Sequence, residues 1–135
     1  MLKKIDHIGI AVSSLKKSIP VFQKLGLELK GVEEVPSQKV RVAFFQVGDV
    51  RIELLEPTSP ESSIGKFLEN RGEGLHHIAY ETGDIEEEMA LLKAANFELI
   101  DQEPREGAHG TKIFFLHPKS TNSVLTEICA HKETK

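Results

Sequence analysis

The stretch Asp6-His7-Ile8-Gly9-Ile10-Ala11-Val12 decides the fold, because a similar stretch, His76-His77-Ile78-Ala79-Tyr80-Glu81-Thr82, follows it 70 positions later. The same offset of 70 continues further along, where Ala43-Phe44-Phe45 falls on Ile113-Phe114-Phe115. A self-similarity that persists through several segments is the signature of a repeated structural unit. The chain is therefore predicted to hold two copies of one unit.

Each copy is predicted to form a strand, a helix and three more strands. Alternating and β-branched residues predict the strands, and apolar residues at helical spacing, such as Leu15, Ile19, Phe22 and Leu25, predict the buried face of the first helix. The expected strands are 4–12, 27–34, 39–47 and 50–56, then 75–82, 97–103, 111–117 and 123–129. The expected helices begin after Ser13 or Ser14 and after Asp84, where Glu87 completes a capping box, and a short linker helix is expected at about 62–70.

Length and composition describe an ordinary soluble domain. The 135 residues suit a single domain, with module 1 at about 1–57, a linker helix at about 58–73 and module 2 at about 74–131. A net charge of -4 offers no basic footprint for nucleic acid, and no apolar run reaches the roughly 20 residues that span a bilayer. One cysteine, Cys129, is expected in the core and fits a cytoplasmic protein.

Two histidines and two glutamates recur at equivalent positions of the repeat. His7 and His77 lie on the first strands, and Glu53 and Glu127 lie on the last, after the register moves by four. A carboxylate directed into a core is costly unless it is paired or bound to a metal. Imidazole and carboxylate ligands suit divalent Mn, Fe, Co, Ni or Zn. We therefore expect His7, Glu53, His77 and Glu127 to bind one metal ion, with positions left open for catalysis.

Other polar residues are weaker candidates. His76 must face away from its neighbour His77 on the strand, which favours a structural role. His109 lies between small residues in Gly107-Ala108-His109-Gly110, a sequence that suits either a close approach to a ligand or a mobile hairpin loop. Three cations, Lys66, Arg105 and Lys119, are either phosphate contacts for a cofactor or substrate, or ordinary surface charge.

The repeated pattern resembles the vicinal oxygen chelate (glyoxalase) superfamily and, within it, the methylmalonyl-CoA epimerase family. The resemblance covers nearly the whole chain and is carried by Ile5–Val12, Ile52–Pro57, Ser63–Leu68, Gly74–Ile78, Gly107–Gly110 and Phe115–Lys119. It implies an α+β fold in which two βαβββ modules form a half-open barrel around the metal site. It places the metal ligands at His7, Glu53, His77 and Glu127, where Glu53 replaces the glutamine of some relatives.

The resemblance implies an enzyme that interconverts (R)- and (S)-methylmalonyl-CoA by proton transfer through a metal-stabilised enolate, as a cytoplasmic homodimer using Co, Mn, Ni or Zn. Glu127 is the first candidate for the catalytic base, and Glu53 is its counterpart for the other face. Some relatives place a glutamate where this chain has Val42, which leaves the second base open. The alternatives are a glyoxalase I-type lactoylglutathione lyase, a non-catalytic binding protein of the superfamily and, less favoured, an extradiol oxygenase.

Overall fold

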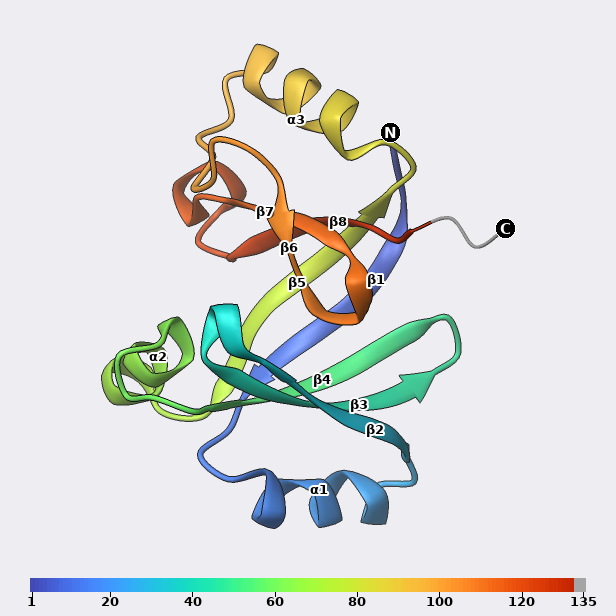
Figure 1. Ribbon diagram of the computed structural model, residues 1–135, viewed down its shortest axis with the longest axis vertical. Helices are drawn as coiled ribbons and strands as arrows, with labels where there is room; N and C mark the ends of the chain where they lie inside the picture. Colours follow the sequence, from blue (N-terminus) through green and yellow to red (C-terminus); the bar gives the residue numbers. More distant parts are fainter. Residues whose placement is uncertain (133–135) are drawn as a thin grey trace. The chain divides into compact units, whose positions relative to one another are not determined.

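The computed structural model describes residues 1–132, so the last three residues of the predicted domain lie outside the described part. The chain divides into two compact units. The N-terminal unit is His7–His76, and the C-terminal unit consists of Met1–Asp6 and the chain from His77 onward. The elements of both units are labelled in Figure 1. That all 135 residues form a single domain stays a prediction.

The N-terminal unit has the predicted order of strand, helix and three strands. It contains β1 (Leu2–Ala11) from His7 onward, α1 (Leu15–Lys24), β2 (Glu28–Val35), a short 3-10 turn at Pro36–Gln38, β3 (Val40–Val47), β4 (Val50–Pro57) and α2 (Ser63–Arg71). The strands lie in the order β2-β3-β4-β1, with β3 antiparallel to both neighbours and β1 parallel to β4. These bounds agree with the prediction to within two residues.

The C-terminal unit repeats this order with shorter strands. It contains β5 (Gly74–Thr82) from His77 onward, α3 (Ile85–Ala94), β6 (Arg105–Glu106), β7 (Lys112–Leu116) and β8 (Thr126–Ala130), with 3-10 turns at Ala108–Gly110 and Pro118–Thr121. β5 runs parallel to β8, and β7 is antiparallel to β8 and β6. Asp84 caps α3 by accepting a hydrogen bond from the Glu87 backbone N–H, which confirms the predicted N-cap. The Asp84 backbone N–H donates to the Thr82 hydroxyl at 3.3 Å, in the place that the Glu87 side chain would take in the predicted capping box.

The strand predicted at 97–103 is wrong. Only an isolated bridge forms there, between Leu99 and Leu116, and the short strand β6 lies further along the chain. The Asp101 carboxylate accepts a hydrogen bond from the Phe115 backbone N–H at 2.8 Å, so a side chain occupies a donor that a regular ladder would use. Pro104, which has no N–H, precedes β6.

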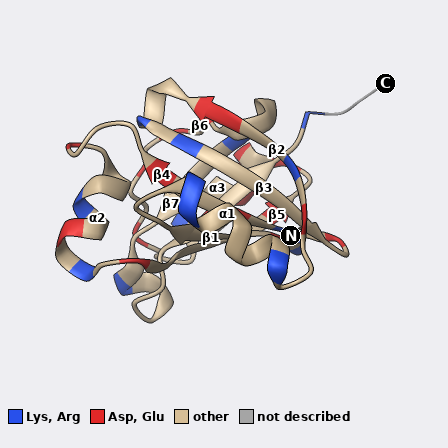
Figure 2. Ribbon diagram, turned by 90° about the horizontal axis from the view of Figure 1, so that it is seen from below, with Lys and Arg blue, Asp and Glu red and all other residues tan. Residues whose placement is uncertain are grey.

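The linker helix α2 begins and ends with well-defined caps. The Ser62 hydroxyl accepts a hydrogen bond from the Gly65 backbone N–H at 3.0 Å, and Gly72 follows the last helical residue. Charges of both signs alternate on its surface, with Lys66, Glu69 and Arg71 along the helix (Figure 2). Among residues 1–132, no helix combines the length and hydropathy that crossing a membrane requires.

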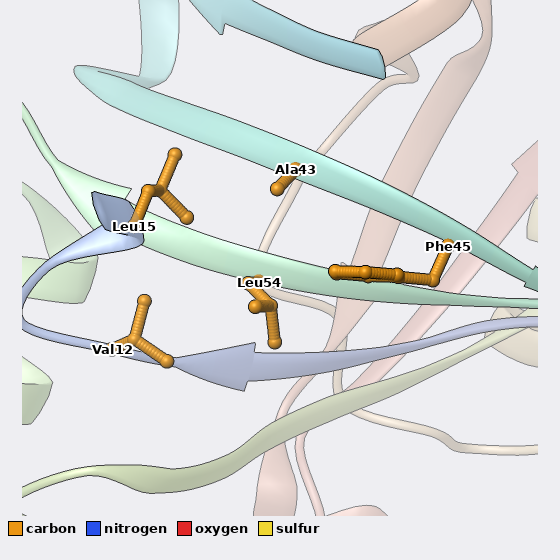
Figure 3. Close-up of a cluster of buried hydrophobic side chains, with 5 residues drawn as sticks. All are labelled: Val12, Leu15, Ala43, Phe45 and Leu54. Carbon is orange, nitrogen blue, oxygen red and sulfur yellow. The ribbon is translucent and has the colours of Figure 1, made fainter. Parts of the chain in front are cut away.

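In the N-terminal unit the core lies between α1 and the sheet. Val12, Leu15, Ala43, Phe45 and Leu54 are buried together (Figure 3), and Ile19 and Phe22 of α1 pack against them. This confirms most of the predicted buried face of α1. Leu25 is an exception, because the helix ends at Lys24 and the Leu25 side chain is 72% exposed.

The third strands of the two units correspond at an offset of 71, one more than the sequence comparison gave. Phe44 stands opposite Glu53, and Phe115 stands opposite Glu127, so Phe44 and Phe115 are equivalent. Each strand carries two adjacent phenylalanines, which makes an alignment by letters ambiguous by one residue. A shift of one residue moves a side chain to the other face of a sheet. The corrected register places both Phe44 and Phe115 beside a candidate ligand.

Gly65 is required by close packing at the start of α2. A Cβ atom at this position would lie 2.6 Å from the Pro60 carbonyl oxygen and 2.8 Å from that of Ser59, and both are backbone atoms. We expect Gly65→Ala to lower the free energy of unfolding by about 1 to 3 kcal/mol, the cost of overpacking. Urea unfolding measures this difference. Gly83→Ala is the matched control, since a Cβ there meets only the Lys3 side chain, at 4.0 Å. Equal unfolding midpoints for the two variants would contradict the expectation.

Candidate metal centre

The N-terminal unit brings one histidine and one glutamate together, and we call this pair the N-terminal half-site. β1 and β4 run in parallel with Gly9 opposite Glu53, so His7, two residues earlier on β1, projects from the same face as Glu53. Their side chains are only 7% and 5% exposed, and His7 Nε2 lies 3.5 Å from Glu53 Oε1. The burial of Glu53 shows that its carboxylate is directed into the interior of the unit and not toward solvent.

The C-terminal unit contains the same arrangement, the C-terminal half-site. Ala79 of β5 stands opposite Glu127 of β8, and His77 lies two residues before Ala79. The side chains of His77 and Glu127 are 5% and 7% exposed, and His77 Nε2 lies 3.3 Å from Glu127 Oε1. The ring of Phe115 meets the His77 ring edge to face, with the ring centroids 5.7 Å apart. This contact restricts the orientation of the His77 ring.

Each half-site fits a divalent metal ion. Two atoms bound to one ion at about 2.0 to 2.2 Å lie about 3.0 Å apart when their bonds are perpendicular, and about 3.4 Å apart at a tetrahedral angle. The nitrogen-to-oxygen separations of 3.5 and 3.3 Å are close to these values and longer than a typical hydrogen bond. Both carboxylates are buried, and a bound cation would offset the cost of removing their charge from water.

The N-terminal half-site has a third member that the sequence reasoning missed. Arg51 lies on β4 two residues before Glu53 and therefore on the same face of the strand. Its Nη2 and Nε atoms lie 3.2 and 3.4 Å from Glu53 Oε2. The alternation of Arg51, Ile52 and Glu53 was the signal that could have identified it. Two residues before Glu127 the chain has Leu125, an apolar residue that packs near Ile113, Phe115 and Cys129.

The candidates for binding a cofactor or substrate lie outside the two half-sites. Lys66 on α2 and Lys119 in the turn after β7 are exposed. His109 is also exposed and adopts a left-handed backbone conformation (φ 58°) within its turn. Arg105 stands over the Phe115 ring at 5.4 Å and pairs with Asp101 at 3.0 Å. Arg105 thus contacts Phe115, a neighbour of the candidate ligands His77 and Glu127.

His76 and Val42 lie as their positions on the strands require. The His76 ring meets Phe67 of α2 edge to face at 5.0 Å, which supports a structural role for it. Val42 is 2% exposed on β3, two residues before Phe44 on the same face. β3 offers no carboxylate between Val40 and Phe45 that could serve as a base.

A further group in the C-terminal unit, formed by Asp6, Cys129 and His131, brings together atoms that could hold a metal ion. Asp6 and Cys129 are buried, and Cys129 belongs to a small apolar cluster, which confirms it as a core residue. His131 Nε2 lies 2.5 Å from Asp6 Oδ1. Two ligands of one ion lie about 3 Å apart. This shorter contact is therefore a hydrogen bond, and it joins the segment after β8 to β1.

Comparisons with known proteins agree with the fold. The model of the Glyoxalase/Bleomycin resistance protein/Dioxygenase superfamily matches residues 6–115. The uncharacterized protein YqjC of Bacillus subtilis is 46% identical over 97% of this chain and 94% of its own length. The ethylmalonyl-CoA/methylmalonyl-CoA epimerase of Cereibacter sphaeroides is 37% identical over 95% of this chain and 98% of its own length.

A solved structure also matches the whole length of the chain. It is a methylmalonyl-CoA epimerase in complex with methylmalonyl-CoA and NH4+, with a TM-score of 0.95 and 36% identity, covering 100% of this chain and 99% of that one. Together with the order of elements in each unit, this confirms the predicted fold class of two βαβββ modules.

Proposed function

The chain belongs to the Glyoxalase/Bleomycin resistance protein/Dioxygenase superfamily and, within it, to the methylmalonyl-CoA epimerases, and we propose that it interconverts (R)- and (S)-methylmalonyl-CoA. The observation that carries the proposal is the pair of equivalent half-sites, each with a buried histidine nitrogen within 3.5 Å of a glutamate oxygen. An isolated buried carboxylate would be costly. Two of them, each beside an imidazole and each recurring at the same place in the repeat, indicate a function shared by the two units.

We propose that His7, Glu53, His77 and Glu127 hold one divalent ion, with Co, Mn, Ni or Zn as the candidates. Nitrogen and oxygen donors suit all four of these metals. When bound, the ion would supply a Lewis acid for the oxygen of the enolate. The half-site geometry supports this ligand set within each unit, and the resemblance to the family supports joining the two pairs around one ion.

The protein's own task is to move one proton. The hydrogen at C2 of methylmalonyl-CoA lies on a carbon between a thioester and a carboxylate, and its removal as a proton leaves a planar enolate. Delivery of a proton to the opposite face of C2 inverts the centre. A base must come within hydrogen-bond reach of that hydrogen. We propose Glu127 as the base, because Glu53, which is buried to the same degree, already has its second oxygen engaged by Arg51. Val42 cannot take part, so β3 supplies no second base.

The candidates for the CoA end of the substrate are surface cations. Lys66 and Lys119, as positively charged side chains, and His109, as a polar one, are exposed, and we propose them as contacts for the phosphates or the pantetheine arm. We further propose a cytoplasmic homodimer, on the resemblance to the family alone. Light scattering on a size-exclusion column measures the mass in solution, and a mass of a single 15.0 kDa chain would contradict the dimer.

One assay separates this function from its rivals. We expect the metal-loaded protein to isomerise methylmalonyl-CoA and to leave the hemithioacetal of methylglyoxal and glutathione unchanged. Conversion of the hemithioacetal alone would indicate a glyoxalase I-type lyase. A protein that binds the CoA ester with no turnover of either substrate would be a binding protein of the superfamily.

A further inference from the structure

Arg51 makes the two half-sites chemically different. Its guanidinium lies 3.2 Å from Glu53 Oε2 through Nη2, while Glu53 Oε1 lies 3.5 Å from His7 Nε2. The two oxygens of one carboxylate therefore have separate partners on opposite sides. The Arg51 side chain is 19% exposed, so this contact is screened from water much more than a surface ion pair.

The backbone holds Arg51 in this place. Arg51 stands opposite His7 in the parallel register of β1 and β4, and Glu53 follows two residues later on the same face. His7, Arg51 and Glu53 are thus neighbours on one surface of the N-terminal sheet. Neither a loop nor a long flexible segment sets their arrangement.

In the C-terminal half-site, the position equivalent to Arg51 holds an apolar side chain. Leu125 stands two residues before Glu127, as Arg51 stands two residues before Glu53, and Leu125 has no group that donates a hydrogen bond.

We propose that Arg51 is a positioning residue that commits Glu53 to binding through one oxygen, because the guanidinium engages the other oxygen. This inference rests on the proposed function and deepens it. A carboxylate that accepts hydrogen bonds from a guanidinium through one oxygen is held in one orientation, and here the other oxygen is directed toward His7 Nε2. Glu53 would thereby be a ligand of fixed orientation that binds through Oε1.

The first test removes the guanidinium and measures metal binding without substrate. Chelator-treated protein is titrated with Co²⁺ by calorimetry, for the unchanged chain and for Arg51→Met. We expect Arg51→Met to weaken Co²⁺ binding by about 10- to 100-fold, the usual effect of losing a group that orients a ligand. Arg51→Lys should restore part of the affinity, since Lys keeps the charge and loses the forked geometry.

A matched control uses another arginine on the neighbouring strand. Arg41 on β3 pairs with Glu56 at 2.7 Å and with Glu34 at 3.4 Å, and its side chain is 45% exposed. Arg41→Met also removes an arginine-glutamate contact, but at the surface. It should leave Co²⁺ affinity and kcat unchanged, and thermal unfolding of both variants shows whether either one is destabilised.

The deciding test is a double-mutant cycle with Glu53→Gln. If Arg51 acts through Glu53, Arg51→Met should change Co²⁺ affinity strongly when Glu53 is present and little when glutamine replaces it. In the assay, kcat should fall with KM for methylmalonyl-CoA unchanged. Equal losses of affinity in both backgrounds, or a raised KM with unchanged Co²⁺ affinity, would show that Arg51 meets the substrate instead, and would overturn the inference.

The proposed function and the role of Arg51 can be refuted independently of each other. Absence of epimerase activity in the unchanged, metal-loaded protein would overturn the proposed function. The cycle in Co²⁺ affinity needs no substrate and still decides whether Arg51 positions Glu53.

Discussion

Replacing Glu127 with glutamine is expected to lower the rate of epimerisation by about 10² to 10⁴, the cost of removing a general base. Glutamine keeps an oxygen at nearly the same place, so the His77 pair can still bind metal, but the amide cannot accept the C2 proton. Elemental analysis of the purified variant should therefore show metal content substantially retained. The rate of interconversion of the two epimers measures the loss.

Two comparisons make the Glu127 result interpretable. Glu106→Gln, at an exposed position on β6, should leave the rate unchanged. Glu53→Gln should lose less activity than Glu127→Gln, because Arg51 already engages the second Glu53 oxygen. Equal losses for the two buried glutamates would mean that both act as bases. A Glu127→Gln protein that keeps its metal and epimerises normally would refute the assignment and direct attention to Glu53 or His109.

Exchange in heavy water gives a finer view of the same variant. If Glu127 serves only one face of the enolate, Glu127→Gln should still introduce deuterium into one epimer without interconverting the two. Mass spectrometry and chiral separation of the product measure this. Deuterium entering both epimers at equal rates would show that Glu127 is not specific to one face.

The second large effect is expected from His77→Ala, which should abolish metal uptake. The imidazole is one of two donors in the C-terminal half-site, and its nitrogen lies 3.3 Å from Glu127 Oε1. Alanine leaves the carboxylate buried with one fewer donor. Metal content by elemental analysis, and epimerase activity after incubation with Co²⁺, measure the effect.

The adjacent histidine is the matched control. His76 lies on the same strand, and its ring contacts Phe67 rather than a glutamate. His76→Ala should keep most of the metal and most of the activity, with some loss of stability from the missing ring contact. Equal losses of metal in the two variants would mean that the wrong histidine has been assigned.

The repeat made the elements and the ligand pairs predictable from sequence. His7 and His77, and likewise Glu53 and Glu127, gained weight as candidates because both residue types recur, and each histidine does lie beside the glutamate of its own unit. A single buried histidine would not have supported the same prediction.

What the sequence did not predict depends on contacts between side chains and backbone. The strand expected at 97–103 fails because the Asp101 carboxylate occupies the Phe115 N–H, and nothing in the local pattern reveals that bond. The offset of 71 in the third strands was hidden by adjacent phenylalanines. Arg51 was overlooked because it has no counterpart in the second copy, where Leu125 stands, and a comparison of repeats finds only what recurs.

The most direct test of the central claim is the isomerisation of a single epimer of methylmalonyl-CoA. Chelator-treated protein is incubated with the (S) epimer, with and without one equivalent of Co²⁺, and the two epimers are then measured by chiral chromatography. We expect conversion to an equal mixture with metal and little or none without it. We expect no conversion by metal-treated His77→Ala. Conversion at the same rate in the metal-free protein would contradict a metal centre at these four residues, and no conversion under either condition would contradict the epimerase itself.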